Sequence, residues 1–152
     1  MSSTLYNALD AVGFRGALMD GRPWVMGWRE STHLYRNGDE GPYVRPIEGG
    51  MAKTRALRSQ RKTQTEEERS NPPYLLTRHH GLSDDVGYRF SNRDWSGYPL
   101  YADTYADWIA NTRGDLLLLG WDFETFGEHH RRDSGIFDFM RSLPKELAQR
   151  NI

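Results

Sequence analysis

The chain has 152 residues, the length of one ordinary domain, and a hydrophobic share of 37% that allows a complete but thin core. It contains no cysteine, which excludes disulfides and thiolate metal sites, and its formal net charge of -1 gives no global field that would attract nucleic acid. No stretch reaches the length of a transmembrane helix, so we expect a soluble, cytoplasmic protein with neither a nucleic-acid nor a membrane partner.

The N-terminal part predicts a helix, a strand and an aromatic loop. Leu5, Leu9 and Val12 recur at helical spacing over residues 3–12. The apolar stretch 14–19 predicts a strand that ends at Asp20-Gly21. Residues 22–36 then place tryptophans among arginines, which suits either stacking on a sugar or a surface loop with buried tryptophan anchors.

Residues 37–73 differ in composition from both flanks. Glycine, proline and charged residues dominate, which predicts an inserted and largely mobile segment. Its basic run could bind phosphates, but an acidic block follows directly, and a solvated linker is the better interpretation.

The second half alternates strand and helix patterns. Residues 74–78 predict a strand, and 102–113 predict the clearest helix, with Tyr105, Trp108 and Ile109 on one face. Residues 135–143 form a further amphipathic stretch, after which Pro144 permits a second helix to start. This order predicts an α/β fold.

The stretch 115–130 carries most of the candidate chemistry. Four leucines run into Gly120, which predicts a buried strand over 115–121. Reactive groups in α/β folds gather at the carboxyl ends of strands, and this strand is followed by acids, aromatics and histidines. Residues i and i+2 of an extended backbone face the same side, so Asp122 and Glu124 could reach one cleft. A solvated loop after a core strand is the simpler alternative.

Two further interpretations stay open on the residues alone. His129 and His130 could hydrogen-bond a substrate hydroxyl or Glu124, or could merely begin a helix. A metal site could be built from neutral imidazoles and carboxylates, although the helical zinc motif with histidines at i and i+4 is absent; its candidate ligands are Asp122, Glu124, Glu128, His129 and His79 or His80. The tryptophans could also bind a glycan without turning it over; those concerned are Trp24, Trp28, Trp95 and Trp121.

The segment from Trp121 to His129, Trp-Asp-Phe-Glu-Thr-Phe-Gly-Glu-His, followed by residues 133–144, resembles glycoside hydrolase family 57, in particular its α-amylase-type branch. Residues 13–21, 82–91 and 99–109 are similar to family segments in the same order. The resemblance covers most of the chain outside 37–73.

The resemblance implies a partial (β/α)7 barrel, an incomplete form of the TIM barrel, that acts on an α-glucan or maltooligosaccharide with retention of configuration and without a cofactor. It places the general acid/base on Asp122 and a supporting role on Glu124. The candidate substrate-binding residues are Trp28, Trp95, Trp121, Phe126 and His129. The family's nucleophilic Glu normally precedes the helix matched by residues 3–12, so we expect an internal piece of a catalytic domain, inactive alone. A non-catalytic glucan-binding or pseudo-enzyme domain is the alternative.

A general acid has to stay protonated near neutral pH, which favours a site shielded from water or one beside another carboxylate, here that of Glu124. Trp121 and Phe123 flank Asp122 in the sequence. We therefore expect Asp122 to be shielded by them and to face a sugar-sized hollow.

Overall fold

A computed structural model describes residues 3–37, 44–46 and 73–152. The chain divides into two compact units. The first unit comprises Met1–Arg78 and Gly114–Leu118, and the second comprises His79–Arg113 and Leu119–Ile152.

A four-stranded mixed sheet forms the centre of the first unit, in the order β1-β4-β2-β3. Strand β1 (Gly16–Met19) pairs in parallel with β4 (Tyr74–Thr77), and Ala17 lies opposite Leu75. Strand β2 (Tyr35–Asn37) is antiparallel to both β4 and β3 (Val44–Pro46). The prediction of an α/β fold is confirmed at this level, since parallel strands and helices share one chain.

Two helices accompany the sheet. The predicted first helix is α1 (Ser3–Ala11), and α2 (Pro23–Met26) is a single turn with proline at its start. The core of the unit is small and aromatic; its buried members are Tyr6, Met26, Tyr35 and Leu75. The Tyr6 hydroxyl also donates to the Pro73 carbonyl at 2.8 Å, which satisfies the polar end of a buried ring.

Three chain segments run in the same direction in the first unit. Arg78, just past the end of β4, forms a parallel bridge with Leu118. Strands β1 and β4 come so close beyond their ends that a Cβ on Gly21 would lie 1.7 Å from the Arg78 carbonyl oxygen. Only glycine permits this approach.

The expected buried strand 115–121 is wrong. Within the described chain, Leu118 makes the single isolated bridge of this stretch, and Leu116–Leu119 are only half-buried. The backbone is committed elsewhere, because the amides of Asp115 and Leu116 both donate to the Thr32 carbonyl, at 2.8 and 3.1 Å. A run of leucines forms a ladder only when a neighbouring strand accepts its hydrogen bonds.

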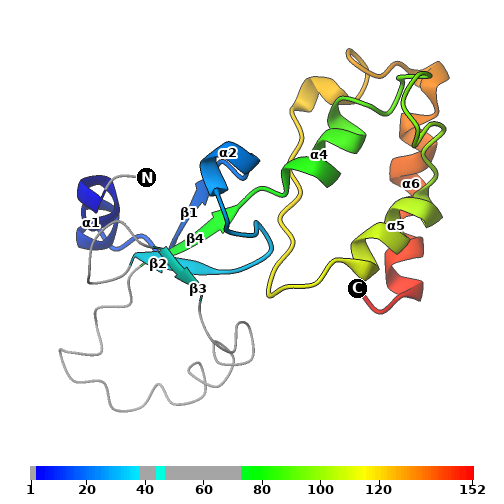
Figure 1. The fold of residues 1–152 in the computed structure, drawn as a ribbon. Coiled ribbons are helices and arrows are strands. Elements are labelled where there is room, and N and C mark those ends of the chain that lie inside the picture. The colour runs from blue at the N-terminus through cyan, green and yellow to red at the C-terminus, as the bar shows by residue number, and fades with distance from the viewer. Residues whose placement is uncertain (1–2, 38–43, 47–72) are drawn as a thin grey trace. The chain divides into compact units, whose positions relative to one another are not determined.

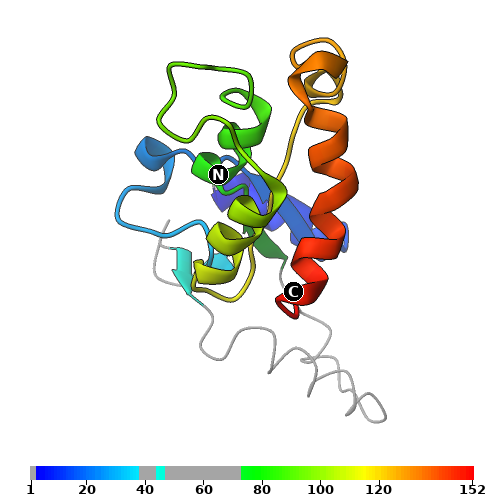
Figure 2. The ribbon, with the colours of Figure 1, turned by 90° about the vertical axis from the view of Figure 1, so that its right-hand side faces the viewer.

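Helices dominate the second unit. They are α4 (His80–Gly87), α5 (Ala102–Asn111) and α6 (Ile136–Gln149), with the short 3-10 turns η2 (Phe123–Thr125) and η3 (Arg132–Ser134). Helices α5 and α6 lie side by side (Figure 1, Figure 2). Between them Phe139 packs edge-on against Phe90 and Tyr105, with ring centroids 5.1 and 5.6 Å apart.

The expected break at Pro144 is also wrong, because α6 continues through the proline to Gln149. Proline removes one helical hydrogen bond. The apolar stripe of Ile136, Phe139 and Leu143 is buried, and Leu147 extends it beyond the proline at helical spacing. Burying one continuous stripe favours one continuous helix.

The predicted insertion at 37–73 lies mostly outside the described residues, and its predicted mobility stays a prediction. The described part includes β3, which pairs with β2. Among the helices that the structure describes, none has the length and apolar character needed to span a bilayer.

Candidate active site

The predicted catalytic residues lie in the second unit, in a loop from Gly120 to His130, which we call the 120–130 loop (Figure 1, yellow to orange). Asp122 has extended backbone and directly precedes the 3-10 turn η2, which contains Glu124. The expectation that both carboxylates share one side of an extended strand is therefore wrong. In a 3-10 turn, successive side chains rotate by about 120° instead of alternating.

The tip of the loop faces solvent. Asp122, Glu124 and His129 are exposed, and the Phe123 side chain is 92% exposed. Phe123 therefore does not shield Asp122, contrary to the sequence-based expectation. The described residues around Asp122 leave its carboxylate accessible to a large substrate.

The backbone of the loop is closed on itself. The Thr125 amide donates to the Asp122 carbonyl at 3.1 Å, and the His129 amide donates to the Glu124 carbonyl at 2.9 Å. The Gly127 amide donates to the His130 carbonyl at 3.0 Å, with φ of 119° at Gly127, a conformation that favours glycine. Thr125, in the middle of the loop, is buried. An exposed tip thus stands on an ordered base.

Trp121 and Phe126 form one aromatic pair at this base. Their rings meet edge to face with centroids 6.1 Å apart, and the Trp121 indole N–H donates to the Ser83 carbonyl at 2.9 Å. Both side chains are half-buried. The indole nitrogen is thereby engaged by α4, while part of each ring surface stays exposed for contact with a ligand.

The other two predicted substrate-binding aromatics belong to different surroundings. Trp28 is in the first unit, 76% exposed, with the Arg29 guanidinium 4.8 Å from its ring centroid. Trp95 is in the second unit and packs edge-on against Trp108 of α5, with centroids 6.2 Å apart. The partly buried ring of Trp95 indicates a packing role, whereas the ring of Trp28 is exposed and carries the Arg29 guanidinium.

The histidines are separated in role. His79 caps α4, where its Nδ1 accepts from the Leu82 amide at 3.1 Å, and burial lowers its pKa. His80 lies 3.4 Å from Asp84. His130 is buried, and its Nδ1 lies 2.7 Å from the Ser91 hydroxyl. The interpretation of His130 as a partner of substrate or Glu124 is replaced by this buried contact.

The metal interpretation receives no support from this arrangement. Across residues 3–37, 44–46 and 73–152 no group of three acidic or histidine side chains is placed to hold an ion. Of the proposed imidazoles, that of His79 is already engaged as the cap of α4, and that of His80 lies 3.4 Å from Asp84 of the same helix.

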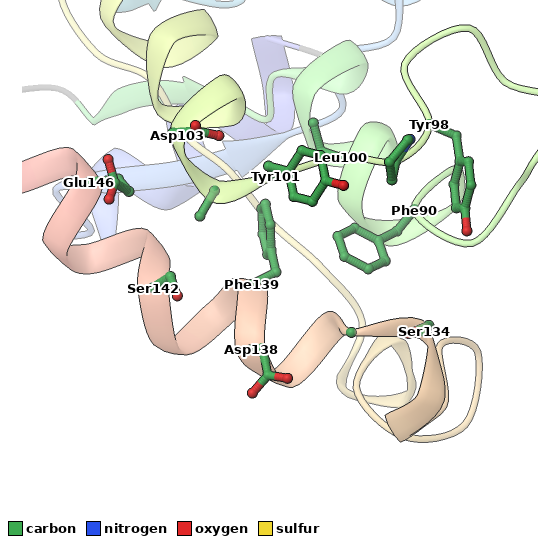
Figure 3. Close-up of a pocket in the computed structure, with 13 residues that line it drawn as sticks. Phe90, Tyr98, Leu100, Tyr101, Asp103, Ser134, Asp138, Phe139, Ser142 and Glu146 are labelled. Atoms are coloured by element: carbon green, nitrogen blue, oxygen red, sulfur yellow. The ribbon is translucent and has the colours of Figure 1, made fainter.

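A cavity of about 450 Å³ lies elsewhere in the second unit, between the loop that leads into α5 and the exposed side of α6 (Figure 3). Tyr98, Tyr101 and Phe139 supply its aromatic surface, and Asp103 and Glu146 supply carboxylates. None of the predicted catalytic or substrate-binding residues lines it. The expected hollow beside Asp122 is therefore not this cavity.

Ser83 and Ser91 are site-associated residues that reasoning from the sequence missed. Each contacts one end of the 120–130 loop. The available signal was the resemblance of residues 82–91 to a family segment, which marked the stretch without indicating what its serines contact.

Comparison with known proteins gives two matches. The model of the family described as Glycosyl hydrolase family 57 matches residues 1–152. A protein of Methanocaldococcus jannaschii named "Putative alpha-amylase" is 38% identical over 138 residues, which cover 91% of this chain and 23% of that protein. The chain therefore spans about a quarter of the length of this relative. No solved structure matches.

The family match extends over the entire chain and includes the Asp-x-Glu-Thr-Phe-Gly-Glu-His string of the 120–130 loop. The relative, at more than 30% identity over nine-tenths of the chain, agrees with it. The chain belongs to glycoside hydrolase family 57.

Proposed function

We propose that this chain forms part of the catalytic domain of a retaining glycosidase that acts on α-glucans, with Asp122 as general acid/base. The family match over residues 1–152 carries the proposal. The name of the Methanocaldococcus jannaschii relative supports an α-glucan as the substrate. The mixed sheet of the first unit, with its parallel β1 and β4, is compatible with part of an incomplete barrel.

The proposed reaction needs two carboxyl groups. Asp122 donates its proton to the glycosidic oxygen as the bond between that oxygen and the anomeric carbon breaks. A carboxylate on the opposite face of the sugar forms the glycosyl ester, and Asp122 then takes a proton from the water that cleaves the ester. The two groups are about 5–5.5 Å apart in retaining enzymes. Glu124 is too local to be that nucleophile, and we assign no residue of this chain to it.

The surroundings of Asp122 suit a polymeric substrate. Asp122 is exposed at the tip of the 120–130 loop. In the sequence it lies between Trp121 and Phe123, and Trp121 pairs with Phe126 at the base of the loop. Aromatic faces stack on sugar rings, and the exposed Glu124 and His129 can accept or donate hydrogen bonds to hydroxyl groups.

A non-catalytic α-glucan-binding domain is the second candidate. The observation that favours it is the exposure of Asp122 together with the 92% exposed Phe123, because this part of the chain does not by itself exclude water from the acid. An exposed aromatic ring next to carboxylates is sufficient for sugar binding without turnover.

The test uses the complete protein that contains this chain, with Asp122→Asn compared with wild type on maltooligosaccharides. Loss of the general acid should lower kcat by roughly 10²–10⁴-fold. The loss in kcat/KM, which reports the first step alone, should be smaller on 4-nitrophenyl α-maltoside, whose leaving group departs without protonation. Asp133→Asn, an exposed aspartate of η3, is the matched control and should retain the wild-type rate.

Full activity of Asp122→Asn would show that the acid/base assignment is wrong. Binding of maltooligosaccharides by the wild type, with no hydrolysis of either substrate, would favour the binding domain instead.

A further inference from the structure

The 120–130 loop is attached at both ends to α4 and the turn that follows it. At the first end lies Ser83, which is fully buried and accepts two hydrogen bonds from the loop. Its hydroxyl accepts from the Gly120 amide at 3.2 Å, and its carbonyl accepts from the Trp121 indole N–H at 2.9 Å. These bonds fix the two residues that directly precede Asp122.

At the other end, His130 closes the loop. The side chain is only 4% exposed, its Nδ1 lies 2.7 Å from the Ser91 hydroxyl, and its ring stands 5.7 Å from that of Phe90. The His130 amide also donates to the Thr125 carbonyl at 3.2 Å. His130 therefore joins the end of the loop to the centre of the loop through its backbone amide, and to the segment after α4 through its buried imidazole.

The His130 imidazole is buried, and burial disfavours its charged form. Burial lowers its pKa, opposed by the nearby backbone of Gly87 and Val86. Its Nε2 is buried and has no hydrogen bond of ordinary geometry to any described residue. In the tautomer that carries its proton on Nε2, the Nδ1 atom accepts from the Ser91 hydroxyl. The contact with Ser91 then depends on a hydrogen-bond acceptor at the Nδ1 position.

The exposed tip is connected to these two attachments by short backbone links. Asp122 follows Trp121 directly, and its carbonyl accepts from Thr125, whose own carbonyl accepts from His130. A shift at either end therefore changes the position of the Asp122 carboxylate. A misplacement of about 1 Å at a reacting group can lower a rate by about 10²-fold. Loss of either attachment should therefore lower the rate of proton transfer from Asp122 as well as the stability of the loop.

We infer that Ser83 and His130 are positioning residues that hold the Asp122 carboxylate in line with the glycosidic oxygen. The inference rests on the proposed function. Neither residue touches the substrate; each acts through the loop that carries the acid.

The test compares Ser83→Ala and His130→Ala with wild type in the complete protein. Both variants should lower kcat on maltooligosaccharides by roughly 10- to 100-fold, while KM changes less than about twofold, because acid placement and not sugar binding is altered. The loss in kcat/KM on 4-nitrophenyl α-maltoside should be several times smaller than on maltooligosaccharides, since departure of that leaving group in the first step needs no acid. His130→Asn, which places an amide oxygen near the Nδ1 position, should recover most of the rate lost in His130→Ala.

Tyr105→Phe is the matched control. The Tyr105 hydroxyl of α5 donates to the Leu82 carbonyl of α4 at 2.7 Å, and Tyr105 is as fully buried as Ser83. Its loss should lower the melting temperature without changing the ratio of the two substrates. If His130→Ala fails to fold, Ser83→Ala alone decides.

The outcomes separate the two proposals. If Asp122→Asn abolishes hydrolysis while Ser83→Ala and His130→Ala retain the wild-type rate, the positioning role is wrong and the glycosidase stands. The positioning role is also wrong if Ser83→Ala and His130→Ala lose activity on both substrates equally and in proportion to their loss of stability. That is the behaviour expected of the control Tyr105→Phe. If the wild type hydrolyses neither substrate, or Asp122→Asn retains full rate, the proposed function fails and the positioning role fails with it.

Discussion

The two units of this chain differ in the contacts that hold their irregular segments in place. In the first unit, backbone meets backbone: β1 and β4 converge so closely that Gly21 lies against the Arg78 carbonyl, and the chain after α5 donates to Thr32. In the second unit, buried side chains reach out to a loop, as Ser83 and His130 do. The first arrangement tolerates almost no added atom, whereas the second depends on particular polar groups. The two units should therefore respond to different substitutions.

The largest loss of stability is expected in the aromatic core of the second unit. Phe139→Ala removes a buried ring that packs against Phe90 and Tyr105, and it should lower the free energy of unfolding by about 3–5 kcal/mol. Phe123→Ala is the same substitution at an exposed position of the same unit and should change it by less than about 0.5 kcal/mol. Chemical denaturation measures both; equal losses would show that the core is placed wrongly.

The close approach in the first unit is tested by Gly21→Ala. The added Cβ would lie 1.7 Å from the Arg78 oxygen, so β1 and β4 must separate, and we expect a loss of about 3 kcal/mol. In Gly16→Ala, at the start of β1, the added Cβ meets its nearest atoms at 3.5 and 3.6 Å, so this variant should be close to neutral. Hydrogen exchange should show faster exchange in β1 and β4 for the first variant alone. A Gly21→Ala protein with unchanged protection of β4 would contradict the register.

A single buried hydrogen bond provides a smaller test in the first unit. Tyr6→Phe removes the donor to the Pro73 carbonyl but keeps the ring in its cluster. The loss should be about 1 kcal/mol, the ordinary net value for such a bond. Thermal unfolding of this variant beside Tyr105→Phe compares one buried hydroxyl in each unit. No change in melting temperature for Tyr6→Phe would mean that water replaces the tyrosine donor.

The smallest effect concerns acid sensitivity in the second unit. Burial lowers the pKa of His79 below its usual 6.5, so the unfolded chain binds a proton more readily than the fold. The stability from neutral His79 is present above pH 6.5 and is lost as the pH falls through the folded pKa. His79→Asn keeps a capping oxygen for α4 without titrating. Its melting temperature should fall less than that of wild type between about pH 7.5 and 5.5, with His130 retaining part of the effect.

An unchanged pH dependence in His79→Asn would show that this histidine is as accessible to protons in the fold as in the unfolded chain. His79 would then still cap α4, but burial would not lower its pKa in the folded protein.

Local patterns were sufficient for much of the fold. Apolar spacing predicted α1, β1, β4, α5 and the beginning of α6, because each of these elements buries a face that its own residues define. The same reasoning failed for the stretch 115–121, where the amides of Asp115 and Leu116 donate to the Thr32 carbonyl. It also failed at Pro144, where burial of a continuous apolar stripe outweighs one missing hydrogen bond. Both failures concern partners distant in the sequence.

The sequence by itself determined the family, through a string of acids and aromatics around Asp122 that is specific enough to recognise. Only the tertiary structure decided how that string is held: as a 3-10 turn with an exposed tip, attached by Ser83 at one end and by His130 at the other. The physical reason is that the family motif consists of neighbouring residues, which can be read directly from the sequence. The hydrogen bonds that hold it join residues 37 and 39 positions apart and form only once the chain has folded.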